Sequence, residues 1–171
     1  MTERTLVLLR HAKAETPGDR ADVDRRLTSR GRKDANAAGA WMAAQKLHPD
    51  LVLCSPAART RQTWEGVSLG LGDARPGDTP EVRYEEGLYD GGRTEIFDLL
   101  RAVPDTVRTV LVVGHNPTIS DVSTMLVPDD DDDGRQIGLK TAGLAVHRSD
   151  RPWSATEPGS MPLVERHTAR G

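Results

Sequence analysis

Three short aliphatic runs constrain the fold of this 171-residue chain more than any other feature. They occupy residues 5–9 (TLVLL), 51–54 (LVLC) and 109–113 (TVLVV). Continuous apolar runs of this length are typical of strands that are buried on both faces of a parallel sheet. A shorter, more polar strand is expected at residues 81–84. All of these runs are far too short to span a membrane.

Segments with helical spacing of apolar residues separate the runs. The first helix is predicted to begin after an N-cap at Thr28 or Ser29 and to reach about Gln45. Pro56 suits the first turn of a second helix with its interior at residues 59–67. The remaining predictions are a loop at residues 70–80, helices at 94–103 and 118–126, and closing strands at 143–148 and 161–166.

Strands that alternate with helices predict βαβ units and a parallel sheet with helices on both faces. We therefore expect an α/β fold. Its architecture would be a three-layer α/β/α sandwich around a mostly parallel central sheet with an antiparallel closing strand. The chain shows no internal repeat and no linker, so we expect a single domain over residues 1–171.

Composition narrows the possible classes of function. The 26 acidic and 23 basic residues give a net charge of −3, which argues against a nucleic-acid groove and a polybasic membrane surface. The single Cys54 excludes an internal disulfide and a Cys-x-x-Cys zinc or redox pair. The N-terminus has no cleavage-site pattern. We expect a cytoplasmic protein that binds neither nucleic acid nor membrane, and we make no prediction of its oligomeric state.

Cationic and imidazole side chains follow three of the predicted strands. Arg10 and His11 follow the first, Arg59 comes shortly after the second, and His115 with Asn116 follows the fourth. In an open α/β sheet the carboxyl ends of the strands form the ligand site. Phosphoryl transfer is catalysed mainly by positioning and by neutralising oxygen charge. Because the chain holds 19 arginines, only the combination is informative, and it predicts a phosphate site.

The same segments resemble the histidine phosphatase superfamily and, within it, the small SixA-like phosphohistidine phosphatases. Ala12 stands where the wider superfamily usually has glycine, a substitution that is common in the SixA-like group. The resemblance covers nearly the whole chain in order. It is carried by residues 8–12 (LLRHA), 55–63 (SPAARTRQT) and 113–117 (VGHNP), with weaker likeness at 25–31 (RRLTSRG) and 140–146 (KTAGLAV).

This resemblance implies a mechanism that needs no metal or other cofactor. His11 would be the nucleophile and would form a transient phosphohistidine that water hydrolyses. Arg10 and Arg59 would clamp the phosphoryl oxygens, and His115 would donate a hydrogen bond to them, with an imidazolium as one possible form. Because the nucleophile must be neutral, we expect neighbouring cations to lower the pKa of His11.

The general acid is the least specified part of this prediction. Larger superfamily members use a carboxylate from the region that contains Glu85 and Glu86, so Glu86 is the candidate, and a solvated loop carboxylate is the alternative. A phosphoramidate leaving group could instead be protonated by water or by His115. Lys13 and Asn116 are further candidate substrate-binding residues.

Neither of two possible metal sites fits the sequence. Residues 129–134 (DDDDDG) fit the first half of an EF-hand loop, but Lys140 stands where the bidentate glutamate is required. A solvated acidic loop is the preferred interpretation. Zinc has no support, because the sequence holds no His-Glu-x-x-His motif and no cysteine pair.

The sequence thus predicts a metal-independent phosphatase that works through a phosphohistidine intermediate. The favoured substrate is phosphohistidine in a phosphorylated protein. The first alternative is a small phosphate monoester, such as a sugar or nucleotide phosphate. The second is a phosphate-binding module without turnover, which would have no need of a nucleophile.

Overall fold

A computed structural model describes residues 2–72, 79–130 and 137–171. These residues form six strands, four α-helices and three short 3₁₀-helices. The strands are β1 (Arg4–Arg10), β2 (Leu51–Cys54), β3 (Glu81–Tyr84), β4 (Thr109–Gly114), β5 (Gly143–Ser149) and β6 (Leu163–Thr168). The helices are α1 (Ser29–Ala44), α2 (Ala58–Leu71), α3 (Arg93–Arg101) and α4 (Thr118–Leu126), with 3₁₀-helices η1 (Asp22–Asp24), η2 (Glu86–Leu88) and η3 (Trp153–Ala155).

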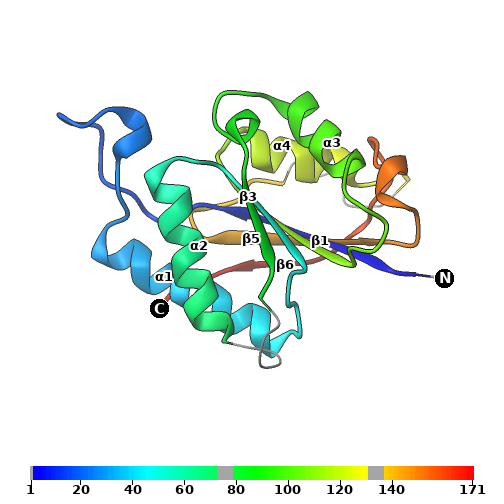
Figure 1. Cartoon of the computed structure of the whole chain (residues 1–171), viewed down its shortest axis with the longest axis horizontal. Coiled ribbons are helices and arrows are strands. Elements are labelled where there is room, and N and C mark those ends of the chain that lie inside the picture. Colours follow the sequence, from blue (N-terminus) through cyan, green and yellow to red (C-terminus); the bar gives the residue numbers. More distant parts are fainter. Residues whose placement is uncertain (1, 73–78, 131–136) are drawn as a thin grey trace.

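The described strands form one sheet in the order β3-β2-β4-β1-β5-β6. β1 and β2 both pair with β4 in parallel, and β3 pairs in parallel with β2. β5 runs antiparallel to both β1 and β6. Figure 1 shows α3 and α4 on one side of this sheet and α1 and α2 on the other. The predicted three-layer α/β/α fold with a mostly parallel sheet is confirmed.

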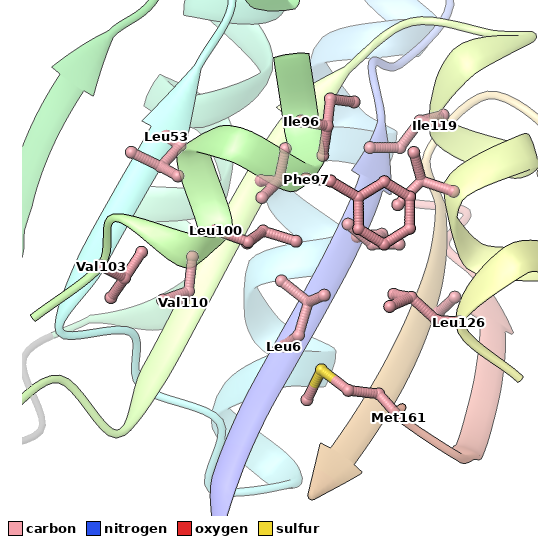
Figure 2. Close-up of a cluster of buried hydrophobic side chains, with 14 of the residues drawn as sticks. Leu6, Leu53, Ile96, Phe97, Leu100, Val103, Val110, Ile119, Leu126 and Met161 are labelled. Atoms are coloured by element: carbon pink, nitrogen blue, oxygen red, sulfur yellow. The ribbon is translucent and has the colours of Figure 1, made fainter. Parts of the chain in front are cut away.

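The central strands are buried on both faces, which is why their sequences are continuously apolar. In β1, Leu6 and Leu8 pack into the cluster beneath α3 and α4, whereas Val7 and Leu9 pack into the cluster beneath α1 and α2. β4 alternates in the same way. Figure 2 shows the first cluster, in which Leu6 faces the aromatic ring of Phe97 and its neighbours from α3 and α4. Burial on both faces therefore fixes the centre of the sheet.

The boundaries of several predicted elements were wrong. The helix expected at residues 94–103 is α3, which ends at Arg101. The loop expected from residue 70 begins later, because α2 continues through Gly70 to Leu71. Gly70 lies so close to α1 that a Cβ there would be 2.1 Å from the carbonyl oxygen of Asn36. The last strand begins at Leu163 instead of residue 161, because the backbone nitrogen of Met161 donates to the carbonyl oxygen of Leu126 in α4 instead of to β5.

α1 and α2 approach so closely that glycine is required between them. A Cβ on Gly39 would lie 2.1 Å from the carbonyl oxygen of Val67, a distance that no real side chain could keep. Thr28 caps the start of α1 by accepting a hydrogen bond of 3.0 Å from the backbone nitrogen of Gly31, as predicted. The position of α2, which carries Arg59, therefore depends on a glycine contact.

We expect Gly39→Ala to lower the free energy of unfolding by about 1–3 kcal/mol, because the added methyl group forces the two helices apart. Urea denaturation measures this change. Gly18→Ala is the control, since the nearest atom to a Cβ there is 3.9 Å away and the position lies in a loop. Equal stability of the two variants would contradict the close contact.

Candidate active site

The parallel pairing of the central strands brings the predicted residues to one edge of the sheet. Arg10 is the last residue of β1 and pairs with Gly114 at the end of β4. The backbone nitrogen of His11 donates a hydrogen bond of 3.0 Å to the carbonyl oxygen of Gly114. On the other side of β4, the backbone nitrogen of Ser55 donates one of 3.1 Å to Val113. Three strand ends are therefore held side by side.

A cavity of about 320 Å³ opens at this edge. Its described lining contains four cationic side chains and no carboxylate. Such a lining favours an anionic ligand of small size. The lining residues are Arg10, His11, Lys13, Ala14, Arg25, Arg59, His115, Asn116 and Thr141.

One hydrogen bond determines which nitrogen of His11 is available for chemistry. The Nδ1 atom of His11 lies 2.7 Å from the carbonyl oxygen of Ala12. A carbonyl oxygen can only accept, so Nδ1 carries the proton and donates it to this bond. In the neutral ring, Nε2 then holds an unshared electron pair. His11 is thus presented as the tautomer that can attack through Nε2.

The loop that carries His11 is tied to the helix that carries Arg59. The backbone nitrogen of Ala12 donates to the hydroxyl of Thr63 at 3.0 Å. The same hydroxyl donates to the carbonyl oxygen of Arg59 at 2.7 Å. The loop that carries His11 and the start of α2 are therefore held at a fixed separation.

Burial keeps His11 neutral. Its pKa is lowered from the usual 6.5 to about 4, first by desolvation and then by the charges of Arg59 and Arg10. The bond to the Ala12 carbonyl acts in the opposite direction, because it favours the protonated ring. Neighbouring cations lower the pKa of His11 as predicted, but burial lowers it more. Near pH 7 the ring is neutral and Nε2 is able to act as a nucleophile.

The two predicted arginines line the cavity, and each has a buried donor without a partner in the described part of the chain. Within the described residues, four buried side-chain nitrogen or oxygen atoms have no hydrogen-bond partner. Three of the four are Nε of Arg10, Nε of Arg59 and Nδ1 of His115. Buried donors without partners are rare in proteins and call for an explanation. An anion bound in the cavity would supply one.

Asp22, in η1, orients the arginines from outside the cavity lining. Its Oδ2 accepts hydrogen bonds from Nη2 of Arg59 at 3.1 Å and from the Tyr89 hydroxyl at 2.7 Å. Its Oδ1 accepts from Nη2 of Arg25 at 2.9 Å. The Tyr89 hydrogen bond and those from the arginines hold the pKa of Asp22 well below its usual range. Asp22 is therefore ionised in this state and has no proton to give to a leaving group.

His115 lies beside His11 as a neutral imidazole. Its ring centroid is 5.3 Å from that of His11. Desolvation, followed by the neighbouring His11 and Arg59, lowers the pKa of His115 to about 3. The imidazolium form considered from the sequence is therefore not the form of His115 in the ligand-free site, because the ring is too buried and too close to cations to take up a second proton.

The three secondary candidates are placed differently. Lys13 lines the cavity and is exposed. Asn116 also lines it, but its amide nitrogen donates to Leu139 at 2.7 Å and its amide oxygen accepts from Ser120 at 2.6 Å. Glu86 is exposed on η2 and is not among the lining residues. Substrate binding by Lys13 and Asn116 stays a prediction, and the acid role of Glu86 gains no support.

Metal binding receives no support from the described residues, which hold no group of three or more His, Cys, Asp or Glu placed to bind an ion. The acidic run that resembles half of an EF-hand falls mostly at residues 131–134, outside the described residues. Among the described helices, none has both the length and the apolar character needed to cross a membrane.

A family comparison decides the class of protein. The sequence profile of the histidine phosphatase superfamily (branch 1) matches residues 6–95, which include Arg10, His11 and Arg59. The chain belongs to this superfamily. The resemblance noted in the sequence is therefore confirmed, and the phosphatase class of enzyme with it.

Individual relatives extend the match over the whole chain of this histidine phosphatase. An uncharacterized protein of Mycobacterium tuberculosis is 38% identical over 95% of this chain and 100% of its own length. A structure from Nakamurella multipartitia, assigned as the phosphohistidine phosphatase SixA, has a TM-score of 0.85 and 35% identity, covering 99% of this chain and 98% of its own. A protein from Agrobacterium tumefaciens with the same assignment has a TM-score of 0.75 and 28% identity, covering 96% and 97%.

Three residues of the site escaped the sequence analysis. Arg25 belongs to a segment that was noted only for its family likeness, and Asp22 and Tyr89 had no signal at all. Residues 13–27 fold back on themselves through an antiparallel bridge between Ala14 and Leu27. Arg25 thereby lines the cavity, and Asp22 contacts Arg25 and Arg59 from outside the lining. Only the folded structure shows this contact, because polar residues in a loop have no characteristic spacing.

The pKa of His11 can be measured by an NMR pH titration of its ring. We expect a midpoint at about 4 in the folded phosphatase and about 6.5 in the urea-unfolded chain. The Arg59→Gln variant should raise the folded midpoint, because one of the charges that disfavour protonation is removed. A folded midpoint near 6.5 would show that His11 is far more exposed to water than the structure indicates.

Proposed function

We propose that this phosphatase removes the phosphoryl group from phosphohistidine in a protein and carries it transiently on His11. The observation that carries the proposal is a set of buried nitrogens without hydrogen-bond partners among the described residues, on the donors Nε of Arg10 and Arg59 and on Nδ1 of His115, together with a neutral His11. These donors fit the oxygens of a phosphoryl group, and Nε2 of His11 has the electron pair that attacks phosphorus.

The reaction would proceed in two displacements at phosphorus. In the first, Nε2 of His11 forms a bond to phosphorus, and the bond to the leaving nitrogen breaks with its electron pair remaining on that nitrogen, which takes a proton from water. In the second, water attacks phosphorus, phosphate departs, and the electron pair returns to Nε2. The phosphorylated ring carries positive charge, which the Ala12 carbonyl stabilises by accepting the Nδ1 proton in a hydrogen bond.

Arg10 and Arg59 would neutralise the negative charge on the phosphoryl oxygens. A guanidinium is planar and donates two parallel hydrogen bonds, so Arg10 and Arg59 fit two edges of a phosphoryl group. Arg59 is 6% exposed, and its interaction with an anion is therefore poorly screened by water. Arg25 and Lys13 add two more positive charges at the cavity rim.

The lining of the cavity favours a nitrogen leaving group over an alkyl oxygen. An alkoxide is a poor leaving group and needs a general acid nearby. The described lining has no carboxylate, Asp22 is ionised, and both histidines are neutral. The ring nitrogen of phosphohistidine is more basic than an ester oxygen and is readily protonated by water. The names of the Nakamurella and Agrobacterium relatives support the same substrate.

Replacement of the nucleophile tests the mechanism. We expect His11→Ala to lower the hydrolysis rate of a chromogenic aryl phosphate by about three orders of magnitude or more, since the covalent route is lost. The assay is run with EDTA present. His48→Ala is the matched control, because His48 lies between α1 and β2, outside the cavity lining, and should keep its rate. Near-normal turnover by His11→Ala would refute the role of His11.

A substrate panel tests the choice of leaving group. We expect kcat/KM for a protein phosphorylated on histidine to exceed that for a sugar phosphate by at least about 100-fold, because the site lacks an acid for the alkoxide. Released phosphate is measured for each substrate at equal concentration. A preference for the sugar phosphate would favour the small-monoester alternative. Phosphate binding by the wild type without any turnover would favour the binding module.

A further inference from the structure

A buried serine contacts His115 at Nε2, so that the other ring nitrogen, Nδ1, is the one without a partner among the described residues. Ser55 is fully buried, and its Oγ is 2.8 Å from Nε2 of His115. The same Oγ accepts a longer hydrogen bond of 3.4 Å from the backbone nitrogen of Ala57, just before α2. Ser55 belongs to the segment that follows β2, and the sequence analysis gave it no role.

The possible proton arrangements of this pair are limited. A serine hydroxyl has one proton to donate and two lone pairs that accept. If Ser55 donates to Nε2, then its proton is used, one lone pair accepts from Ala57, and His115 carries its own proton on Nδ1. The proton on Nδ1 is then the single donor of the pair that has no partner among the described residues.

The opposite arrangement leaves more groups unsatisfied. If Nε2 of His115 donates to Ser55, the hydroxyl accepts from both His115 and Ala57. Its own proton then has no acceptor among the described residues, although the side chain is fully buried. Nδ1 of His115 becomes a buried lone pair without a donor. Each unsatisfied buried polar group carries a desolvation penalty, so the first arrangement is favoured.

We propose that Ser55 is a positioning residue that holds His115 as the Nδ1–H tautomer and so directs its one proton toward the phosphoryl oxygens. This inference rests on the proposed function, because it assigns a purpose to the unpartnered Nδ1. In the neutral ring, the nitrogen that accepts the hydrogen bond from Ser55, Nε2, carries no proton, so the proton is on Nδ1. A neutral His115 in the other tautomer would present a lone pair to the phosphate, and the two would repel.

The ring has further support that keeps Nδ1 in place. Tyr89 packs edge-on against His115, with ring centroids 5.7 Å apart and an interplanar angle of 73°. The hydroxyl of Tyr89 is itself fixed by its hydrogen bond to Asp22. His115 is thus held by Ser55 on one side and by Tyr89 on another, while its ring lines the cavity beside His11.

A second buried serine–histidine pair provides a control that distinguishes a role in catalysis from a role in stability alone. Ser123 in α4 is also fully buried, and its Oγ is 2.7 Å from Nε2 of the buried His147. Nδ1 of His147 donates to the carbonyl oxygen of Met161 at 2.9 Å. Nε2 of His147 must therefore accept from Ser123, which is the arrangement proposed for Ser55 and His115. Neither Ser123 nor His147 lines the active-site cavity.

The first test reads the tautomer directly in the unmodified, ligand-free protein. A two-bond proton–nitrogen NMR spectrum distinguishes a ring nitrogen that carries a proton from one that does not. We expect Nδ1 of His115 to be protonated, as in His147, and inorganic phosphate to shift the Nδ1–H signal of His115 only. A proton on Nε2 of His115, or no response to phosphate, would overturn the proposal without bearing on His11 as the nucleophile.

The second test compares two serine variants of the whole chain. Ser55→Ala and Ser123→Ala each remove one buried hydroxyl from a histidine, so both should lower the melting temperature. Only Ser55→Ala should lower kcat, by about 10- to 100-fold, because loss of a partner behind a functional histidine has effects of that size. Its spectrum should show His115 protonated on Nε2 or as a mixture. Equal kcat in the two variants, or an unchanged tautomer in Ser55→Ala, would refute the positioning role.

Discussion

Burial of β1, β2 and β4 on both faces is the constraint on which the rest of the structure depends. A strand that is covered by helices on either side cannot expose polar side chains along its length, so polar groups collect where it ends. Parallel pairing then aligns these ends. Arg10, His11, Ser55 and His115 lie together because β4 is paired with β1 on one side and with β2 on the other. The active site is thus a consequence of how the core is built.

The second determinant is the close contact between α1 and α2. Gly39 and Gly70 allow the backbones to touch, and Gly31 allows the start of α1 to lie against Lys13. This places α2, with Arg59, and residues 13–27, with Asp22 and Arg25, on the same side of the cavity. The arginine positions therefore depend on three glycines that take no part in the chemistry.

Much of this arrangement could be predicted from patterns formed by residues that are close together in the sequence. The strands, the Thr28 cap and the convergence of Arg10, His11, Arg59 and His115 follow from periodicity and from the rule for strand ends. The end of α2 could not be predicted, because Gly70 is indistinguishable from a helix breaker until its contact with Asn36 is known. Asp22 and Tyr89 were missed for the same reason, since their partners are distant in sequence. The charge of His115 depends on burial, which no motif reports.

The two histidines are complementary in their protonation. Nδ1 of His11 donates to a backbone carbonyl, which leaves a lone pair on Nε2. Nε2 of His115 lies against a serine hydroxyl, and its Nδ1 faces no protein partner among the described residues. A neutral nucleophile beside a neutral second imidazole avoids the repulsion that two imidazolium rings would have at 5.3 Å. The positive charge in the described cavity lining then comes from Lys13 and from three arginines, which keep their protons at any physiological pH. The cavity therefore combines a cationic lining with an unprotonated Nε2 on His11.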